Sequence, residues 1–332
     1  MNYKDWLKVS IVIVLLGIGY YRFRMQVYSD DRTQIVMDTF ISVKVKTKNS
    51  KTNLLLDSAF YMVTMYDQKF SYFDENSLLY KINHSEIETH QIDSDFYEML
   101  QVAQKLYHES NLLYDISIGT LIDLWDFSTE EIPSAEDIES AMENIGFEKL
   151  LFSENFLLKP VNMKLNFGSI CKGFVIDKVM DYLISQNVVE ASINAGGDIK
   201  FYSNKKRKWK VGIQHPRNEA TIKATLNIPD FAVATSGDYE RYFILDDRRY
   251  HHILDPSTGF PANQNVSVTI FTESATLADA LSTAAFVMNP FYAIELIKSF
   301  ENTEAIIYFF DEKNVLTSIE TENIRKWIIN KN

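Results

Sequence analysis

The most informative chemistry in the sequence lies in residues 234–261, which read ATSGDYERYFILDDRRYHHILDPSTGFP. Two glycine turns, at Gly237 and Gly259, bracket the segment. Turns of this kind place backbone N–H groups and hydroxyls where an anion can bind. Between them, His252 and Asp255 can carry protons or bind a metal. The segment has the pattern of a hairpin and by itself indicates a ligand that carries phosphate.

A second set of reactive side chains lies on the segment SATLADALSTAAFVM, which has a helical pattern. Asp279 and Thr283 are four residues apart, so they share one helix face. An aspartate in so apolar a helix is costly to bury unless it is paired or binds a metal. One carboxylate and one hydroxyl, together with backbone carbonyls, suit Mg²⁺. The alternative is that Asp279 caps a loop or pairs with a lysine or arginine.

Two further glycine clusters could hold an anion or a flat ligand. Residues 165–178 (LNFGSICKGFVIDK) read as a strand, a turn at Gly168 and a helix. A helix N-terminus after glycine attracts anions, and Lys172 could reach a phosphate. The spacing does not fit the GxxxxGK[ST] pattern, which excludes a P-loop. Residues 194–199 (NAGGDI) allow close backbone approach, with a β-bulge as the alternative.

Aromatic and sulfur-bearing residues add less specific signals. Asp115 and Ser117 lie near Trp125, which could pack beside an aromatic ligand or belong to the core. The single cysteine, Cys171, excludes an intrachain disulfide and a cysteine-based zinc site, and we expect it to be a small buried residue.

Composition limits the function classes. The chain has 332 residues with 46% hydrophobic and 13% aromatic content, which excludes disorder and ensures a sizeable core. Its net charge of −12 argues against general nucleic-acid binding, which needs a basic face. The basic run at residues 205–208 is expected to be a solvated loop.

The N-terminus contains an apolar run at residues 9–21, with Lys4 and Lys8 before it and Arg22 and Arg24 after it. The run is shorter than the ~20 residues that span a bilayer comfortably, yet it has the length of a signal-peptide core. No small-residue cleavage site follows it. We therefore expect an uncleaved signal anchor over residues 1–30, with a buried helix of the main domain as the alternative.

The elements that position these clusters follow from hydrophobic periodicity. Strands are expected at 35–46 and in short runs between 189 and 233, and a final hairpin surrounds residues 311–314. Helices are expected at 51–65, 95–109 with Ser94 as N-cap, 134–146, 172–185 and 274–288. Asn289 and Pro290 should start another helix. Residues 33–330 thus read as one continuous α+β unit.

Taken in order, the clusters resemble the ApbE family of flavin transferases. The resemblance covers roughly residues 35–290 and rests on eight motifs in register: MDTF, SYFDENSLLYKIN, YDISIGTLIDLWDF, LNFGSICKGFVID, NAGGDI, TSGDYERYF, HHILDPSTGFP and ADALSTA. It implies a single duplicated α+β domain with mainly antiparallel sheets and flanking helices. It also implies an Mg²⁺-dependent enzyme that splits FAD, attaches FMN through a phosphoester bond to a Thr or Ser of a target protein, and releases AMP.

The resemblance also implies roles for individual residues. Asp279 and Thr283 would bind the metal, with Ser169 supplying a third group. The residues that would line the FAD site are Met37, Tyr72, Tyr114, Asp115, Asn166, Lys172 and Ile253. Asn166 stands where the family often has Asp, so it brings no negative charge. The family's usual place is outside the cytoplasmic membrane, where the target would be an extracytoplasmic or membrane redox protein.

In such a transfer the acceptor hydroxyl loses its proton when its oxygen bonds to phosphorus, and a base must accept that proton. His252, with an ordinary pKa near 6.5, is the candidate for taking it from the acceptor hydroxyl, and Asp255 could orient the imidazole. Together with Asp279, His252 forms the predicted catalytic pair. Two alternatives stay open: a metal-dependent FAD pyrophosphatase that gives FMN and AMP, and a non-catalytic membrane-tethered flavin-binding protein.

Overall fold

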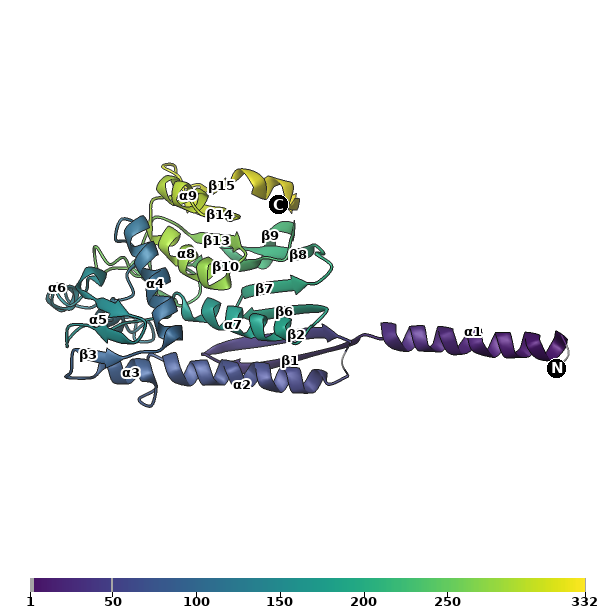
Figure 1. Ribbon diagram of the computed structural model, residues 1–332. Helices are drawn as coiled ribbons and strands as arrows, with labels where there is room; N and C mark the ends of the chain where they lie inside the picture. Colours follow the sequence, from purple (N-terminus) through teal and green to yellow (C-terminus); the bar gives the residue numbers. More distant parts are fainter. Residues whose placement is uncertain (1–2, 49, 332) are drawn as a thin grey trace.

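The computed structural model describes residues 3–48 and 50–331. Its first helix, α1 (Tyr3–Met25), projects away from the body of the protein (Figure 1). Among these described residues, no helix is long and apolar enough to cross a membrane. The anchor predicted over residues 1–30 stays a prediction, which this finding does not support. Residues 1 and 2 and the side chains of Lys4, Arg22 and Arg24 lie outside the described part.

A single eight-stranded sheet forms the centre of the molecule, in the order β1-β2-β6-β7-β10-β13-β14-β15. Every neighbouring pair is antiparallel. The predicted class, α+β with mainly antiparallel sheets, is confirmed. Its strands are β1 (Tyr28–Val36), β2 (Thr39–Thr47), β6 (Glu190–Ala195), β7 (Asp198–Ser203), β10 (Ala232–Gly237), β13 (Ser267–Thr272), β14 (Glu304–Phe310) and β15 (Leu316–Glu320).

Helices cover one face of this sheet: α2 (Thr52–Phe70), α7 (Cys171–Ser185), α8 (Ala275–Val287) and α9 (Pro290–Lys298). Helix α8 packs against α7 and against strands β10 and β13. The residues of α8 are mostly small and apolar, and nearly all of them are buried. This burial places Asp279 inside the main core rather than on a solvated face.

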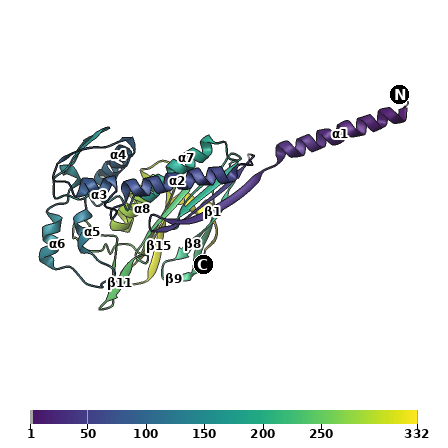
Figure 2. The same ribbon diagram turned by 90° about the horizontal axis from the view of Figure 1, so that it is seen from below.

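A second, three-stranded sheet covers part of the opposite face, as the view from below shows (Figure 2). It consists of β8 (Trp209–His215), β9 (Asn218–Ile228) and β16 (Ile328–Lys331), the last preceded by the short 3₁₀ helix η2 (Glu322–Lys326). Val211 and Leu226 pack there against Phe271 and Tyr308 of the large sheet. The central sheet is thus buried on both faces over these strands.

A smaller lobe lies at the end of the sheet away from α1 (Figure 1). It contains α3 (Leu78–Asn83), α4 (Ser94–Glu109), α5 (Gly119–Leu124), α6 (Ala135–Met142), the 3₁₀ helix η1 (Phe147–Lys149) and a small sheet of β3 (Thr89–Gln91), β5 (Phe156–Leu158) and β4 (Leu151–Ser153).

The hairpin of β11 (Tyr242–Leu245) and β12 (Arg248–His251) adjoins this lobe. Its two turn residues, Asp246 and Asp247, have positive φ, as the two-residue turn of a twisted hairpin requires. Phe243 and Tyr250 pack with Trp125 in a separate small core. The hairpin predicted within residues 234–261 is confirmed.

Most predicted helices appear within a few residues of their expected bounds, because their periodicity is strong. The helix expected at 134–146 is shorter and ends at Met142. Ser94 is not the cap of α4: the Asp93 side chain accepts the N–H of Phe96, so Asp93 is the N-cap. The cap at Asn289 is confirmed.

The strands of the large sheet lie side by side in chain order from β1 to β15. This order offers no support for the duplication that the resemblance implied.

Candidate active site

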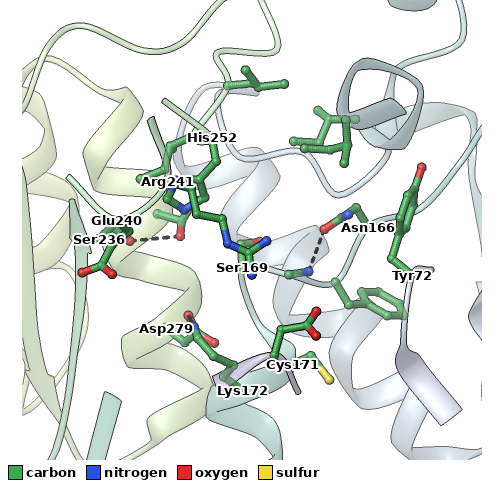
Figure 3. Close-up of a pocket in the computed structure, with 18 of the residues that line it drawn as sticks. Tyr72, Asn166, Ser169, Cys171, Lys172, Ser236, Glu240, Arg241, His252 and Asp279 are labelled. Atoms are coloured by element: carbon green, nitrogen blue, oxygen red, sulfur yellow. Dashed lines mark hydrogen bonds and ion pairs between the residues drawn. The ribbon is translucent and has the colours of Figure 1, made fainter. Parts of the chain in front are cut away.

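A cavity of about 910 Å³ opens between the main body and the smaller lobe (Figure 3). Its walls come from the β1–β2 turn, the end of α2, the loops before α5 and α7, strand β10, the β11–β12 hairpin and α8. The structure brings all eleven predicted site residues to this one cavity: Met37, Tyr72, Tyr114, Asp115, Asn166, Ser169, Lys172, His252, Ile253, Asp279 and Thr283.

Three charged residues form the floor of the cavity. The Lys172 ammonium lies 2.7 Å from Asp198 Oδ2 and 3.2 Å from Asp279 Oδ1. Asp279 Oδ2 accepts the backbone N–H of Gly173 at 2.9 Å. The N-terminus of α7, predicted to attract an anion, therefore already holds the carboxylate of Asp279. The alternative that Asp279 pairs with a lysine is borne out for the structure as it stands.

Close packing of α7 on α8 makes this arrangement possible. A Cβ on Gly173 would collide with the carbonyl of Ala275 and with the Asp279 side chain. Glycine is therefore required here for close helix approach. The N-terminus of α7 can then reach Asp279, a residue 106 positions further along the chain.

The electrostatics of the three residues are strongly linked. Burial acts to lower the pKa of Lys172, but the Asp198 and Asp279 carboxylates outweigh it and raise that pKa. Burial raises the pKa of Asp198, with a further contribution from Asp279 and opposition from Lys172. At neutral pH Lys172 is charged, and the neighbouring carboxylates of Asp198 and Asp279 compensate its charge.

Hydroxyl groups cluster beside this floor. Ser236 Oγ lies 2.7 Å from Ser282 Oγ and 3.1 Å from Thr283 Oγ1. The Ser169 hydroxyl donates to the phenol oxygen of Tyr114 at 3.0 Å. Oxygen donors of this kind, with the carboxylate of Asp279, suit Mg²⁺. The described residues contain no group of three or more His, Cys, Asp or Glu that could hold a metal, so a metal here would need hydroxyl and ligand oxygens beside the carboxylate of Asp279.

Aromatic residues and turns shape the opposite side. The Tyr72 hydroxyl lies 2.8 Å from both the Gly119 carbonyl and Asp123 Oδ1. Asn166 Oδ1 accepts the N–H of Gly168 at 2.7 Å and so forms the turn before α7. Trp125 lines the cavity and donates its indole N–H to the Gly259 carbonyl at 2.9 Å. Trp125 is therefore a core residue that also lines the cavity, and its packing beside an aromatic ligand stays a prediction.

His252 stands on the hairpin wall. Burial lowers the pKa of His252 to about 4, and the neighbouring His251 and Arg241 act in the same direction. The imidazole is therefore neutral at pH 7 and can accept a proton. Its Nδ1 is buried and has no hydrogen-bond partner among the described residues.

Asp255 does not orient His252, which corrects that expectation. Its Oδ1 accepts the N–H of Ser257 at 2.8 Å and the hydroxyl of the same residue at 2.6 Å. Its backbone carbonyl accepts the N–H of Gly259. The carboxylate therefore builds the DPSTG turn, which is the ordinary role of an aspartate before such a turn.

Two other cavity residues have roles that the sequence did not resolve. Asp115 accepts from the Ser117 N–H and hydroxyl and from the Phe147 N–H, so it fixes the loop before α5. Burial raises the pKa of the Cys171 thiol to about 12, which makes it inert, as expected of a small buried residue.

Six charged cavity residues were missed by the sequence analysis: Asp38, Asp67, Asp126, Asp198, Glu240 and Arg241. Asp198 and Arg241 lie inside quoted motifs, NAGGDI and TSGDYERYF, where their charge next to a turn was the available signal. Asp67 is on α2, and its carboxylate approaches the N–H of Met37 at 3.4 Å. No local pattern marks that contact.

Comparisons with known proteins agree with this geometry. A sequence model of the ApbE family matches residues 37–307. The FAD:protein FMN transferase of Treponema pallidum is 28% identical over 333 residues, covering 93% of this chain and 92% of that protein. The protein of the same description from Vibrio cholerae is 29% identical over 303 residues, covering 86% of this chain and 88% of that protein.

Solved structures share the fold. The ApbE protein from Thermotoga maritima superposes with a TM-score of 0.82 at 29% identity, covering 90% of this chain and 99% of that one. The flavin transferase ApbE from Vibrio cholerae has a TM-score of 0.80 at 23% identity, covering 91% of this chain and all of that one, which by itself shows the fold alone. The ApbE sequence model matches well over half of the residues of this chain, and so the chain belongs to the ApbE family.

Proposed function

We propose that this protein is an FAD:protein FMN transferase. The observation that carries the proposal is that eleven residues chosen from six separate motifs line one cavity. That cavity, at about 910 Å³, is large enough for a dinucleotide-sized ligand. Relatives that match nearly the whole chain carry the same description.

The proposed substrate is FAD, with its flavin against the aromatic side and its diphosphate toward the polar floor. Tyr72 and Trp125 offer flat surfaces for the ring system. Lys172 and the hydroxyls of Ser169 and Thr283 belong to the polar floor. In this placement the flavin lies against aromatic side chains, and the diphosphate lies near charged and hydroxyl-bearing ones.

The proposed metal is Mg²⁺, held by Asp279 and Thr283 with Ser169 as a third group. The donor set fits, because all three supply oxygen and one is anionic. When bound, the ion would neutralise charge on the phosphate oxygens. Lys172, 3.2 Å from Asp279 Oδ1, holds that carboxylate in position.

The proposed step is an in-line phosphoryl transfer. The hydroxyl oxygen of a Thr or Ser on the acceptor protein forms a bond with the flavin-side phosphorus, and the bond to the AMP phosphate breaks. AMP leaves with the electron pair of that bond. His252, neutral at pH 7, accepts the hydroxyl proton.

A co-expression experiment tests the function directly. The full chain is produced with a candidate acceptor, and the acceptor's mass is measured; the purified proteins are also incubated with FAD and Mg²⁺. We expect an acceptor heavier by one FMN, with one AMP released per adduct, and loss of both when EDTA is added. Free FMN and AMP without an adduct would indicate a pyrophosphatase, and FAD binding without turnover would indicate a flavin-binding protein.

We further propose that the acceptor is a redox protein outside the cytoplasmic membrane and that the catalytic domain works on that side. This rests on the family resemblance. Protease added to intact cells should digest the domain if the proposal is right, whereas protection until lysis would contradict it.

A further inference from the structure

The charge around the cavity raises a problem for a diphosphate ligand. Seven carboxylate residues line it: Asp38, Asp67, Asp115, Asp126, Asp198, Glu240 and Asp279. In the part of the chain that the structure describes, two residues with a permanent positive charge, Lys172 and Arg241, line it as well. Apart from the proposed Mg²⁺, a diphosphate that enters this cavity therefore needs a cationic side chain whose charge is still available.

Lys172 does not meet that requirement alone. Its ammonium pairs with Asp198 at 2.7 Å and with Asp279 at 3.2 Å. Two buried carboxylates already pair with this one ammonium, which leaves it little charge to offer a ligand.

Arg241 is in the opposite situation. It follows strand β10 and directly precedes β11, and Figure 3 shows its side chain extending into the cavity. Among residues 3–48 and 50–331, no carboxylate lies within ion-pair distance of its guanidinium, while 15 such contacts involve other residues. The side chain is exposed, so its charge is available to a ligand.

The backbone beneath Arg241 is nevertheless well held. Its carbonyl accepts the N–H of His252 at 3.1 Å, at the base of the hairpin. Three residues earlier, Asp238 forms a bidentate ion pair with Arg217, with both N–O distances at 2.6 Å. The backbone of Arg241 is held in place, and its guanidinium has no ion-pair partner among the described residues. This arrangement is expected of an arginine that binds an anion.

We propose that Arg241 binds the diphosphate of the dinucleotide and makes the cavity select ligands that carry it. This inference rests on the proposed function. The planar guanidinium presents parallel N–H donors that match phosphate oxygens. Its position beside His252 places this charge on the hairpin wall, facing the floor that holds Lys172 and Asp279.

Binding measurements with two flavins test the proposal. FAD and riboflavin, which lacks phosphate, are titrated into the full chain, Arg241→Met, Arg241→Lys and the control Arg248→Met, with flavin fluorescence as the readout. Arg248 lies on β12, stacks on Tyr250 at 5.1 Å and does not line the cavity. We expect Arg241→Met to weaken FAD binding by about 10- to 100-fold, Arg241→Lys to weaken it less, and riboflavin binding to stay unchanged.

The outcomes separate this inference from the function on which it rests. Equal weakening of FAD and riboflavin by Arg241→Met would indicate a packing role and overturn the proposal, as would unchanged FAD affinity. In both cases the parent still binds FAD, so the proposed function survives. Failure of the parent to bind FAD at all would overturn both. Weakened FAD binding in Arg248→Met to the same extent would also overturn the assignment, because the effect would then be one of overall charge.

Discussion

The two walls of the cavity are built in different ways. The α7–α8 wall belongs to the main core, and its polar groups are already satisfied: Lys172 pairs with two aspartates and Asp279 also accepts the N–H of Gly173. The hairpin wall rests on a small separate core around Trp125. It presents the guanidinium of Arg241 and the buried Nδ1 of His252, neither of which has a partner among the described residues.

The difference has a physical reason. Charges buried in a large core are tolerated only when paired, so that wall can hold donors in fixed positions but has little capacity left for new partners. The hairpin has β12 as the only strand partner of β11 among the described residues. Arg241 and His252, at the base of the hairpin, line the cavity. We infer that the helical wall positions the site and the hairpin wall engages the ligand and the moving proton.

The largest expected effect comes from the helical wall. Asp279→Asn removes the only carboxylate of the proposed metal set, so we expect the rate of FMN transfer to fall about 10³-fold. Quenched-flow or end-point measurement of adduct formation gives the rate, and fluorescence titration gives FAD binding separately. A rate equal to that of the parent would mean that this wall is structural only.

The next largest effect should come from the hairpin wall. His252→Ala removes the proposed proton acceptor, and we expect the transfer rate to fall about 10²-fold while FAD still binds. His108→Ala, at an exposed position on α4, is the matched control and should retain the parent rate. Unchanged transfer in His252→Ala with bound FAD would remove His252 from the mechanism.

Packing of the helical wall can be tested through stability. Gly173→Ala forces α7 away from Ala275 and Asp279, and we expect the free energy of unfolding to fall by about 1–3 kcal/mol. Gly17→Ala is the control, because a Cβ there has nothing within 4 Å. Chemical denaturation of both variants measures the difference; equal stability would show that the helices can separate without cost.

The smallest effect concerns pH and the hairpin. The pKa of His252 falls from its ordinary value of 6.5 to about 4 on folding, so the unfolded chain binds more protons between these values. Stability should therefore decrease as pH falls through this window, by on the order of 1–2 kcal/mol at pH 5. His252→Gln should lose this part of the pH dependence. Identical curves for parent and variant would mean that the imidazole is not desolvated.

Local patterns predicted much of this protein. Hydrophobic periodicity identified α2, α4, α7 and α8, since a helix that packs on a sheet needs one apolar face. The resemblance to the ApbE family supplied Met37, Tyr72, Tyr114, Asn166 and Ile253, whereas glycine turns and short polar motifs pointed to Lys172, His252, Asp279 and Thr283. These signals lie within a few residues of one another, and so they can be read along the chain.

Tertiary structure decided the partners and therefore the roles. Asp279 and Lys172 are 107 residues apart, and only the packing of α8 on α7 makes them an ion pair. Asp255 could have oriented His252, but its oxygens bind Ser257. Asp198 and Arg241 carried only their charge beside a turn as a local signal, yet Asp198 compensates Lys172 and Arg241 has no ion-pair partner among the described residues. The sequence alone determined which groups were available; the folded chain decided which were satisfied and which stayed free, because hydrogen bonds and ion pairs depend on contacts between distant segments.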